Sequence, residues 1–378
     1  MTIVSSLHRF VDVCERSPAY VRAIAPYQPG KPISELAREM GLKEANIVKL
    51  ASNENPLGAS PKALAAMRVA LDDVSRYPDG NGFELRMALA KKYGIAAESI
   101  VLGNGSNDVL EMVAHACLAP GASAIYSQHA FAVYPLVTQA TGATGIEVPA
   151  RDFGHDLDAM ARAVRGDTRV VFVANPNNPT GTWLAPDALH SFLRRLPADV
   201  LLVLDEAYYE YLDPGLRGDS LKWLEQFPNL VISRTFSKAY GLAGLRVGFA
   251  FAHPQVADLM NRVRQPFNVS SIAQAAAVAA LADQEFVQES RSLNGQGMLA
   301  LTTGFRRLGL SWIPSYANFI SFKVPMAADV FQRLLRHGVI VRPIAGYGMP
   351  DYLRVTIGTA AENVRFQAAL EAVLTELP

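Results

Sequence analysis

The chain has little cysteine and no excess of charge of either sign. Its 378 residues include two cysteines, Cys14 and Cys117, which form no CxxC pair, so a disulfide framework and a thiolate zinc site are both disfavoured. None of the seven histidines falls in an HExxH or similar spacing, and we expect no metal. The 35 basic side chains are balanced by 35 acidic ones, so no basic face favours nucleic acid as a partner.

Long hydrophobic runs are also absent. No run approaches the roughly 18 apolar residues of a membrane span, and the first residues lack the basic and apolar stretches of a secretion signal. Together with the low cysteine content, this predicts a protein of the reducing cytoplasm. Two matches to the Asn-x-Ser glycosylation pattern, at Asn104 and Asn268, are therefore attributed to chance.

Half of the residues are hydrophobic, and the length favours two domains or one large domain with a smaller lobe. Between about residues 100 and 250, short continuous apolar runs alternate with helical stretches. The runs lie at 100–102, 124–126, 170–173, 200–204 and 230–232. Strands of this kind, separated by helices, predict a mainly parallel α/β sheet that is covered on both faces.

The two ends of the chain differ from this middle part. Three prolines between positions 26 and 32 predict an extended arm, followed by a helix from Ile33 to Met40 with Ser34 as its N-cap. After about residue 265, an Ala-rich helix at 272–281 precedes strand-like segments at 319–322 and 353–357. We expect an arm with part of the small domain at 1–52, a large domain at 53–265 and a small C-terminal α+β domain at 266–378.

Lys238 has the most informative surroundings in the chain. It follows the apolar run at 230–232 and lies among hydroxyl, small and glycine residues, in the order Ser237-Lys238-Ala239-Tyr240-Gly241. Most lysines are solvated surface charges. A lysine in a tight, partly desolvated pocket has a lowered pKa and can act as a nucleophile, and we interpret Lys238 in this way.

Other polar residues also follow predicted strands, and ligands bind at the carboxyl ends of strands in parallel sheets. Asp205 follows the run at 200–204, where it either caps the next helix or faces a protonated ring nitrogen. Asn178 lies in the loop 175–181, whose prolines and glycine are by themselves ordinary turn formers. Residues 103–108 end a strand and open a helix, either as a plain turn or as a backbone cradle for a phosphate.

A nucleophilic lysine, a carboxylate, an amide, a tyrosine and a phosphate cradle suit a phosphorylated pyridine aldehyde. The lysine forms a Schiff base with the aldehyde, and the carboxylate keeps the ring nitrogen protonated so that the ring accepts electrons. A dinucleotide-binding dehydrogenase is disfavoured, because Asp108 stands where the last glycine of GxGxxG would be and Lys238 would have no role.

The motifs around these residues resemble those of the fold-type-I pyridoxal-phosphate (PLP) aminotransferases, and most of all the histidinol-phosphate aminotransferase family. The similarity extends over nearly the whole chain and is specific through the order and spacing of its motifs. These lie at 53–58, 76–80, 175–181, 205–208, 237–238 with Arg246, and 353–358. The resemblance implies a large domain with a mainly parallel seven-stranded sheet between helices, and a smaller α+β domain.

The resemblance also implies roles for individual side chains. Lys238 is the Schiff-base lysine and then a proton shuttle, Asp205 pairs with the pyridine nitrogen, and Tyr208 bonds the ring 3-oxygen. The other expected cofactor contacts are Asn178 at the same oxygen, Phe131 stacked on the ring, and Gly105, Ser106, Asn107, Thr235, Ser237 and Arg246 around the phosphate. Tyr77 would reach the cofactor phosphate of a neighbouring subunit, which implies a homodimer with shared active sites.

Substrate residues follow from the same resemblance. Arg354 would bind a substrate carboxylate bidentately, whereas Arg342 and Tyr27 suit a substrate with a phosphate ester in that place. Asn55 is assigned to the substrate as well. The implied reaction, part of histidine biosynthesis, transfers an amino group between histidinol phosphate and 2-oxoglutarate in a ping-pong cycle, giving imidazole acetol phosphate and glutamate.

Three alternatives share this framework. An aromatic amino acid aminotransferase is disfavoured only through Arg342 and Tyr27, which suit a phosphorylated substrate. A threonine-phosphate decarboxylase also binds a phosphorylated substrate but releases carbon dioxide. A PLP-binding transcription regulator carries an extra DNA-binding domain, for which we expect no room ahead of the arm.

Overall fold

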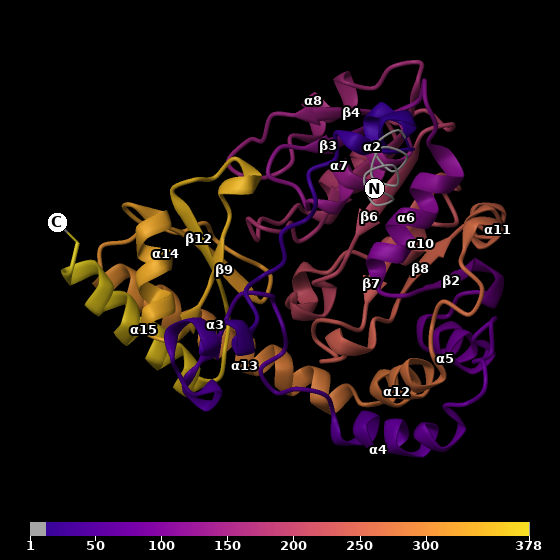
Figure 1. Ribbon diagram of the computed structural model, residues 1–378. Helices are drawn as coiled ribbons and strands as arrows, with labels where there is room; N and C mark the ends of the chain where they lie inside the picture. Colours follow the sequence, from indigo (N-terminus) through magenta and orange to yellow (C-terminus); the bar gives the residue numbers. More distant parts are fainter. Residues whose placement is uncertain (1–12, 378) are drawn as a thin grey trace, which may run out of the picture.

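The computed structural model describes residues 13–377, which form a large and a small domain (Figure 1). The small domain, mainly orange and yellow, lies on the left of Figure 1, and the large domain lies on the right. The first residues, in which the sequence predicts no secretion signal, lie outside the described range. Between residues 13 and 377, no helix combines the length and apolar character that crossing a membrane requires.

A seven-stranded sheet forms the centre of the large domain, in the order β2-β8-β7-β6-β5-β3-β4. Its strands are β2 (Ile100–Gly103), β3 (Ser123–Ser127), β4 (Thr144–Val148), β5 (Thr168–Ala174), β6 (Leu201–Asp205), β7 (Leu230–Thr235) and β8 (Gly248–Ala252). β8 is antiparallel to both of its neighbours, and the other pairs are parallel. The mainly parallel sheet is therefore confirmed, and each apolar run of the sequence overlaps one of its strands.

Helices cover both faces of this sheet, which explains why its central strands are mostly apolar runs. On one face, Val101 belongs to a hydrophobic cluster with α6 (Ser106–Cys117), α7 (Val133–Ala140) and α11 (Pro254–Val263). On the other face, Ile100 and Leu102 belong to a cluster with α5 (Phe83–Tyr93), α8 (Leu157–Arg162), α9 (Pro186–Leu193) and α12 (Ser271–Ala282). α4 (Pro61–Ala70) lies against α12, and α10 (Ser220–Trp223) contacts β7.

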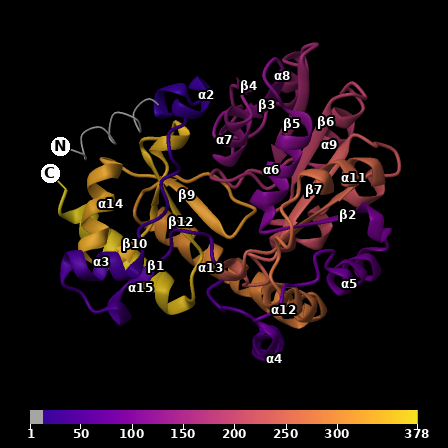
Figure 2. The ribbon, with the colours of Figure 1, turned by 45° about the vertical axis from the view of Figure 1, so that its right-hand side comes forward.

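The small domain has a hydrophobic cluster of its own. Its antiparallel sheet has the order β11-β12-β9, and a short parallel pair joins β1 to β10. The strands are β1 (Val48–Lys49), β9 (Phe319–Lys323), β10 (Val339–Ile340), β11 (Arg342–Pro343) and β12 (Tyr352–Thr356), and the helices are α13 (Gln284–Arg307), α14 (Ala327–Arg336) and α15 (Ala360–Thr375). α13 continues from α12 toward this domain (Figure 2), so the expected α+β domain is confirmed.

The N-terminal segment contacts both domains. α2 (Ala19–Arg22) lies beside α7, and α3 (Ile33–Met40) packs on the small domain through Leu36. The helix α3 follows Pro32 without a side-chain cap, and Ser34 is already helical, so its prediction as the N-cap is wrong. Although α12 lies beyond position 265, it packs with the large sheet, and the division of the chain at 52 and 265 stays a prediction.

A buried ion pair stabilises the carboxyl ends of β6 and β7. Arg234 is 1% exposed and donates from Nε and Nη2 to Glu206 Oε2, at 2.9 and 2.7 Å. Its guanidinium also lies 3.7 Å from the ring centroid of Tyr209. Because Glu206 directly follows Asp205, the pair fixes the backbone beside a predicted catalytic carboxylate.

Replacing Arg234 with methionine leaves the buried Glu206 charge unpaired, and we expect it to lower the free energy of unfolding by about 3–5 kcal/mol. The matched control is Arg262→Met, which removes the exposed ion pair with Asp258 and should cost about 0–1 kcal/mol. The midpoints of thermal unfolding of both variants provide the measurement. Equal losses in the two variants would contradict the structural role of the buried pair.

Candidate active site

A cavity lies between the two domains, at the carboxyl ends of the large sheet. Its walls come from segments that follow β2, β3, β5, β6 and β7, from β11 and β12 of the small domain, and from the N-terminal arm. Of the residues singled out in the sequence, it brings together Tyr27, Ser106, Asn107, Phe131, Asn178, Asp205, Tyr208, Thr235, Ser237, Lys238, Arg246, Arg342 and Arg354.

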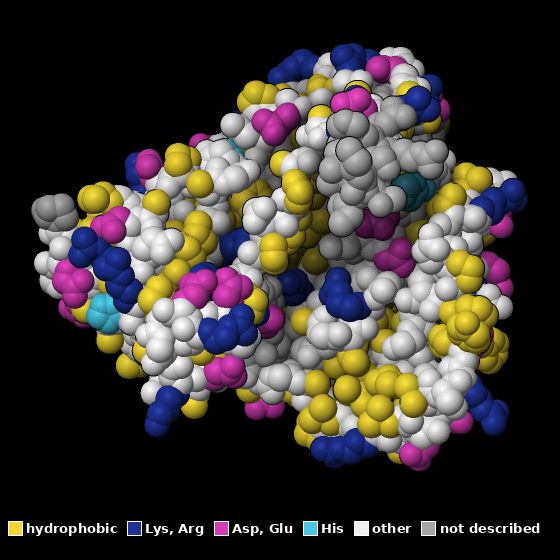
Figure 3. Space-filling view, viewed as in Figure 1, with side chains coloured by type: hydrophobic (Ala, Val, Ile, Leu, Met, Phe, Trp, Pro, Cys, Tyr) yellow, Lys and Arg dark blue, Asp and Glu magenta, His cyan; other side chains and the backbone are white. Residues whose placement is uncertain are grey.

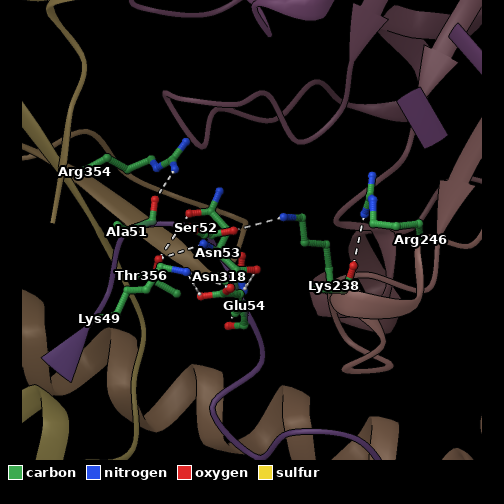
Figure 4. A network of polar contacts seen from close by, with 11 residues as sticks. Lys49, Ala51, Ser52, Asn53, Glu54, Lys238, Arg246, Asn318, Arg354 and Thr356 are labelled. Atoms are coloured by element: carbon green, nitrogen blue, oxygen red, sulfur yellow. Dashed lines mark hydrogen bonds and ion pairs between the residues drawn. The ribbon is translucent and has the colours of Figure 1, made fainter. Parts of the chain in front are cut away.

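Lys238 reaches into this cavity from the loop after β7 (Figure 4). Its Nζ lies 3.3 Å from the carbonyl oxygen of Ser52 and 5.7 Å from the ring centroid of Tyr208. Burial, and after it the nearby Arg354 guanidinium, lower the pKa of Lys238 to about 8. Near neutral pH a far larger fraction of this amine is therefore uncharged than of a surface lysine, as a nucleophile requires.

Asp205 ends β6 and is 5% exposed. Its Oδ2 accepts a hydrogen bond from the Tyr134 hydroxyl at 2.9 Å, and its Oδ1 accepts one from the Ala207 N–H at 3.2 Å. Burial raises the pKa of Asp205 to about 6, against the opposing effect of these two donors. No lysine or arginine among residues 13–377 lies within ion-pair distance of Asp205. Its side chain caps no helix, and the site fits a cationic ligand group such as a protonated ring nitrogen.

The segment between β2 and α6 forms an anion cradle. α6 begins at Ser106, and Gly105 has a φ of +81°, a conformation that glycine adopts without strain. A Cβ atom at Gly105 would lie 2.6 Å from Nη2 of Arg246, whose Nη1 in turn donates to Ser237 Oγ at 3.3 Å. The first N–H groups of a helix have no partner within it. The helix N-terminus, the guanidinium and the hydroxyl therefore converge on one position that suits a phosphate.

Arg342 and Arg354 are directly opposite each other on the antiparallel strands β11 and β12. Arg354 is 6% exposed and donates to Asn178 Oδ1 at 2.5 Å and to the Ala51 carbonyl at 2.8 Å, and its Nε has no partner. Arg342 Nη2 lies 3.5 Å from the Tyr27 hydroxyl. No carboxylate of the described chain pairs with either guanidinium. Because like charges opposite each other repel, this wall of the cavity suits an anionic ligand.

Asn55 and Tyr77 do not line the cavity. The Asn55 side-chain amide donates to the Ala239 carbonyl at 2.9 Å and to Ser290 Oγ at 2.8 Å. Asn55 therefore holds the chain in place instead of facing a substrate, contrary to the expectation. Tyr77 is 82% exposed on the surface of the large domain. It lies away from the cavity of its own chain, but another molecule can contact it there.

Asn53, Tyr134 and Tyr347 are among the lining residues that escaped the sequence analysis. Asn53 donates from Nδ2 to the Tyr208 hydroxyl at 2.8 Å, and it opens the motif 53–58 in which Asn55 was chosen instead. Tyr134, which donates a hydrogen bond to Asp205, lies three positions after Phe131 in the first turn of α7, and this proximity could have indicated it. Tyr347 lies in the loop between β11 and β12, and no pattern in the sequence marks it.

Comparison with known proteins agrees with this site. The family described as aminotransferase class I and II matches residues 45–370. The chain belongs to this family. It is 64% identical to histidinol-phosphate aminotransferase 2 of Nitrosospira multiformis over 365 residues, which are 96% of this chain and 93% of that protein. It is 65% identical to histidinol-phosphate aminotransferase of Methylobacillus flagellatus over 358 residues, which are 95% and 97%.

Solved structures give the same picture of the fold. Histidinol-phosphate aminotransferase from Sinorhizobium meliloti, in complex with pyridoxal-5'-phosphate, has a TM-score of 0.88 and 30% identity, covering 96% of this chain and 98% of that one. Aspartate aminotransferase from Thermus thermophilus with maleate has a TM-score of 0.81 and 25% identity, covering 95% and 99%. The fold-type-I architecture is thereby confirmed.

The lowered pKa of Lys238 predicts a pH dependence in protein freed of any cofactor. Because the amine is uncharged above its pKa, reductive methylation of Lys238 should reach half its maximal rate near pH 8. Lys222 donates a hydrogen bond to Asp219 that raises the pKa of its amine, so Lys222 should require a higher pH than Lys238. Arg354→Met should move the Lys238 midpoint upward. Peptide mass spectrometry measures both sites, and a shared midpoint would contradict the prediction.

Proposed function

We propose that this aminotransferase uses PLP to transfer an amino group between histidinol phosphate and 2-oxoglutarate. The observation that carries the substrate assignment is the opposed pair Arg342 and Arg354, which faces the cavity without a carboxylate partner in the described chain. A phosphate ester or a carboxylate supplies the missing charge, and guanidinium groups bind both. Two relatives that are 64% and 65% identical to this chain are named histidinol-phosphate aminotransferases, which favours histidinol phosphate over an aromatic amino acid or threonine phosphate.

The residues around the cavity fit PLP. Asp205 is a buried carboxylate that needs a cation, and the pyridinium nitrogen is one. The cradle at Ser106 and Asn107, with Arg246 beside it, suits the phosphate, and Phe131 offers a ring for stacking. When bound, PLP accepts the electrons that remain at the substrate Cα after its proton leaves.

The chain itself supplies orientation and proton transfer. Arg354 and Arg342 bind the anionic end of the substrate and so hold its Cα near Lys238. With PLP bound, the Lys238 amine, uncharged in a large fraction of molecules because of its lowered pKa, would accept the substrate Cα proton and return it at C4′ of the cofactor. Tyr208, held by Asn53, donates a hydrogen bond to the ring 3-oxygen.

A homodimer of the cytoplasm with shared active sites is part of the proposal. Hydrophobic side chains gather on the surface over α4 (Figure 3). Exposed members around α4 and α5 are Leu64, Val69, Leu71, Val74, Tyr77, Phe83, Met87 and Phe267. A patch of this kind marks an interaction surface, and a second copy would bring Tyr77 of one subunit to the cavity of the other.

A single-turnover titration tests the reaction. Histidinol phosphate, phenylalanine or threonine phosphate is added to the PLP-loaded protein without a keto acid, and the visible absorbance of the cofactor is followed. We expect histidinol phosphate to remove this absorbance at a far lower concentration than phenylalanine. Response mainly to phenylalanine would assign an aromatic aminotransferase, and carbon dioxide release from threonine phosphate would assign a decarboxylase.

Arg342→Ala should separate the phosphorylated substrate from aromatic amino acids. Loss of charge-assisted hydrogen bonds to the phosphate, about 2–3 kcal/mol, should reduce kcat/KM for histidinol phosphate by roughly 30- to 150-fold. The value for phenylalanine should fall by less than about threefold. Arg336→Ala, at an exposed arginine of α14, is the matched control and should change neither value. Equal losses for both substrates would show that Arg342 does not discriminate between them.

A further inference from the structure

Phe267 holds Tyr77 on the surface of the large domain. The two rings stack with centroids 4.7 Å apart and planes at 23°. Phe267 has a φ of +57°, which is unfavourable for a bulky residue and persists only where the surroundings impose it. Its ring also covers the turn after Tyr77, since a Cβ atom at Gly80 would lie 3.3 Å from it. Because Phe267 remains 46% exposed, its own burial does not account for this conformation.

Asn268, the next residue, contacts the anion cradle. Its Nδ2 donates to Asp108 Oδ2 at 2.6 Å and to the Leu102 carbonyl at 3.1 Å. The same Asp108 oxygen accepts the N–H of Asn104 at 2.7 Å. Asn268 therefore orients the carboxylate that holds the loop between β2 and α6, and this loop presents the N–H groups at Ser106 to a phosphate.

Arg264 links the turn after Tyr77 to Asn268. Its Nη1 donates to the Gly80 carbonyl at 2.7 Å and to Asn268 Oδ1 at 3.0 Å. Both ends of the Asn268 amide are thus bound, which fixes its orientation. Gln274 adds a second link to the same turn by donating to the Asp79 carbonyl at 2.9 Å.

We propose that residues 264–268 position two cofactor phosphate sites at once. Asn268 acts on the cradle of its own subunit, and Phe267 presents Tyr77 to the cavity of the partner subunit. Both are positioning residues. The inference rests on the proposed dimer with shared sites and has a distinctive consequence: a change at Phe267 acts on the other subunit's site, whereas a change at Asn268 acts on its own.

Hybrid dimers separate the two effects. One subunit carries Lys238→Ala, so only the other subunit can bind PLP through its lysine. Differently tagged subunits are co-expressed, the mixed dimer is purified and freed of cofactor, and PLP is titrated while the absorbance of the lysine-bound cofactor is followed. Phe267→Leu or Asn268→Ala is placed either on the Lys238→Ala subunit or on the subunit that keeps Lys238.

We expect Phe267→Leu to weaken PLP binding by about tenfold, or about 1.4 kcal/mol, when it is on the Lys238→Ala subunit, and by less than about twofold on the other. Asn268→Ala should show the reverse pattern. Phe267→Tyr, which keeps the ring, should bind PLP normally, and Phe83→Leu, at another exposed phenylalanine of this surface, is the matched control. Asp108→Asn provides a second variant for the Asn268 contact and should follow the pattern of Asn268→Ala.

The role of Phe267 would be overturned if Phe267→Leu weakened PLP binding only in its own subunit, or no more than Phe83→Leu does. Asn268→Ala and Asp108→Asn acting equally from both subunits would overturn the role of Asn268. Failure of the dimer proposal looks different. A monomeric parent protein in sedimentation, or a Tyr77→Phe change that weakens PLP only in its own subunit, would contradict the shared sites themselves.

Discussion

The candidate active site depends on charged side chains, two of them buried, that no opposite charge of the described chain pairs. Asp205 lies at the end of a buried strand with two hydrogen-bond donors but no cation, and Arg342 and Arg354 oppose each other with no carboxylate from the described chain. Each of these arrangements is unfavourable in an empty cavity, because desolvated charges lose more than their hydrogen bonds return. A ligand with a pyridinium at one end and a substrate anion at the other would pair Asp205 and the two arginines at the same time. The same charge pairs would therefore give the ligand both its affinity and its orientation.

The charge of Arg354 also affects the pKa of Lys238, the proposed nucleophile. After burial, the Arg354 guanidinium is the largest influence that lowers the pKa of Lys238. An anion bound to Arg354 would neutralise part of that positive potential and would raise the pKa of Lys238. The amine would then become a stronger base when a substrate is in place to give up its Cα proton. On the proposed function, Arg354 would therefore couple substrate binding to general base catalysis, and a neutral residue at position 354 would lose both effects.

Much of the large domain could be predicted from the sequence, because strands buried on both faces are continuous apolar runs. Two strands escaped for physical reasons: β4 lies at the edge of the sheet with mostly exposed residues, and β8 is an antiparallel strand of alternating Phe and Ala. Site residues at strand ends, such as Asp205 and Lys238, were predictable in the same way. The choice of Asn55 over Asn53 failed because two asparagines two positions apart differ only in which long-range partner each one finds.

Contacts between distant segments explain what local patterns could not indicate. In the sequence, Asp108 was informative only because it replaces the last glycine of a GxGxxG motif, which disfavoured a dinucleotide-binding site. In the structure its carboxylate accepts hydrogen bonds from Asn104 and from Asn268, which is 160 positions away. A glycine at position 108 has no carboxylate and could not accept these two hydrogen bonds. Asp108 therefore holds the loop that suits a single phosphate, and Asn268 has a structural role that its match to a glycosylation pattern does not indicate.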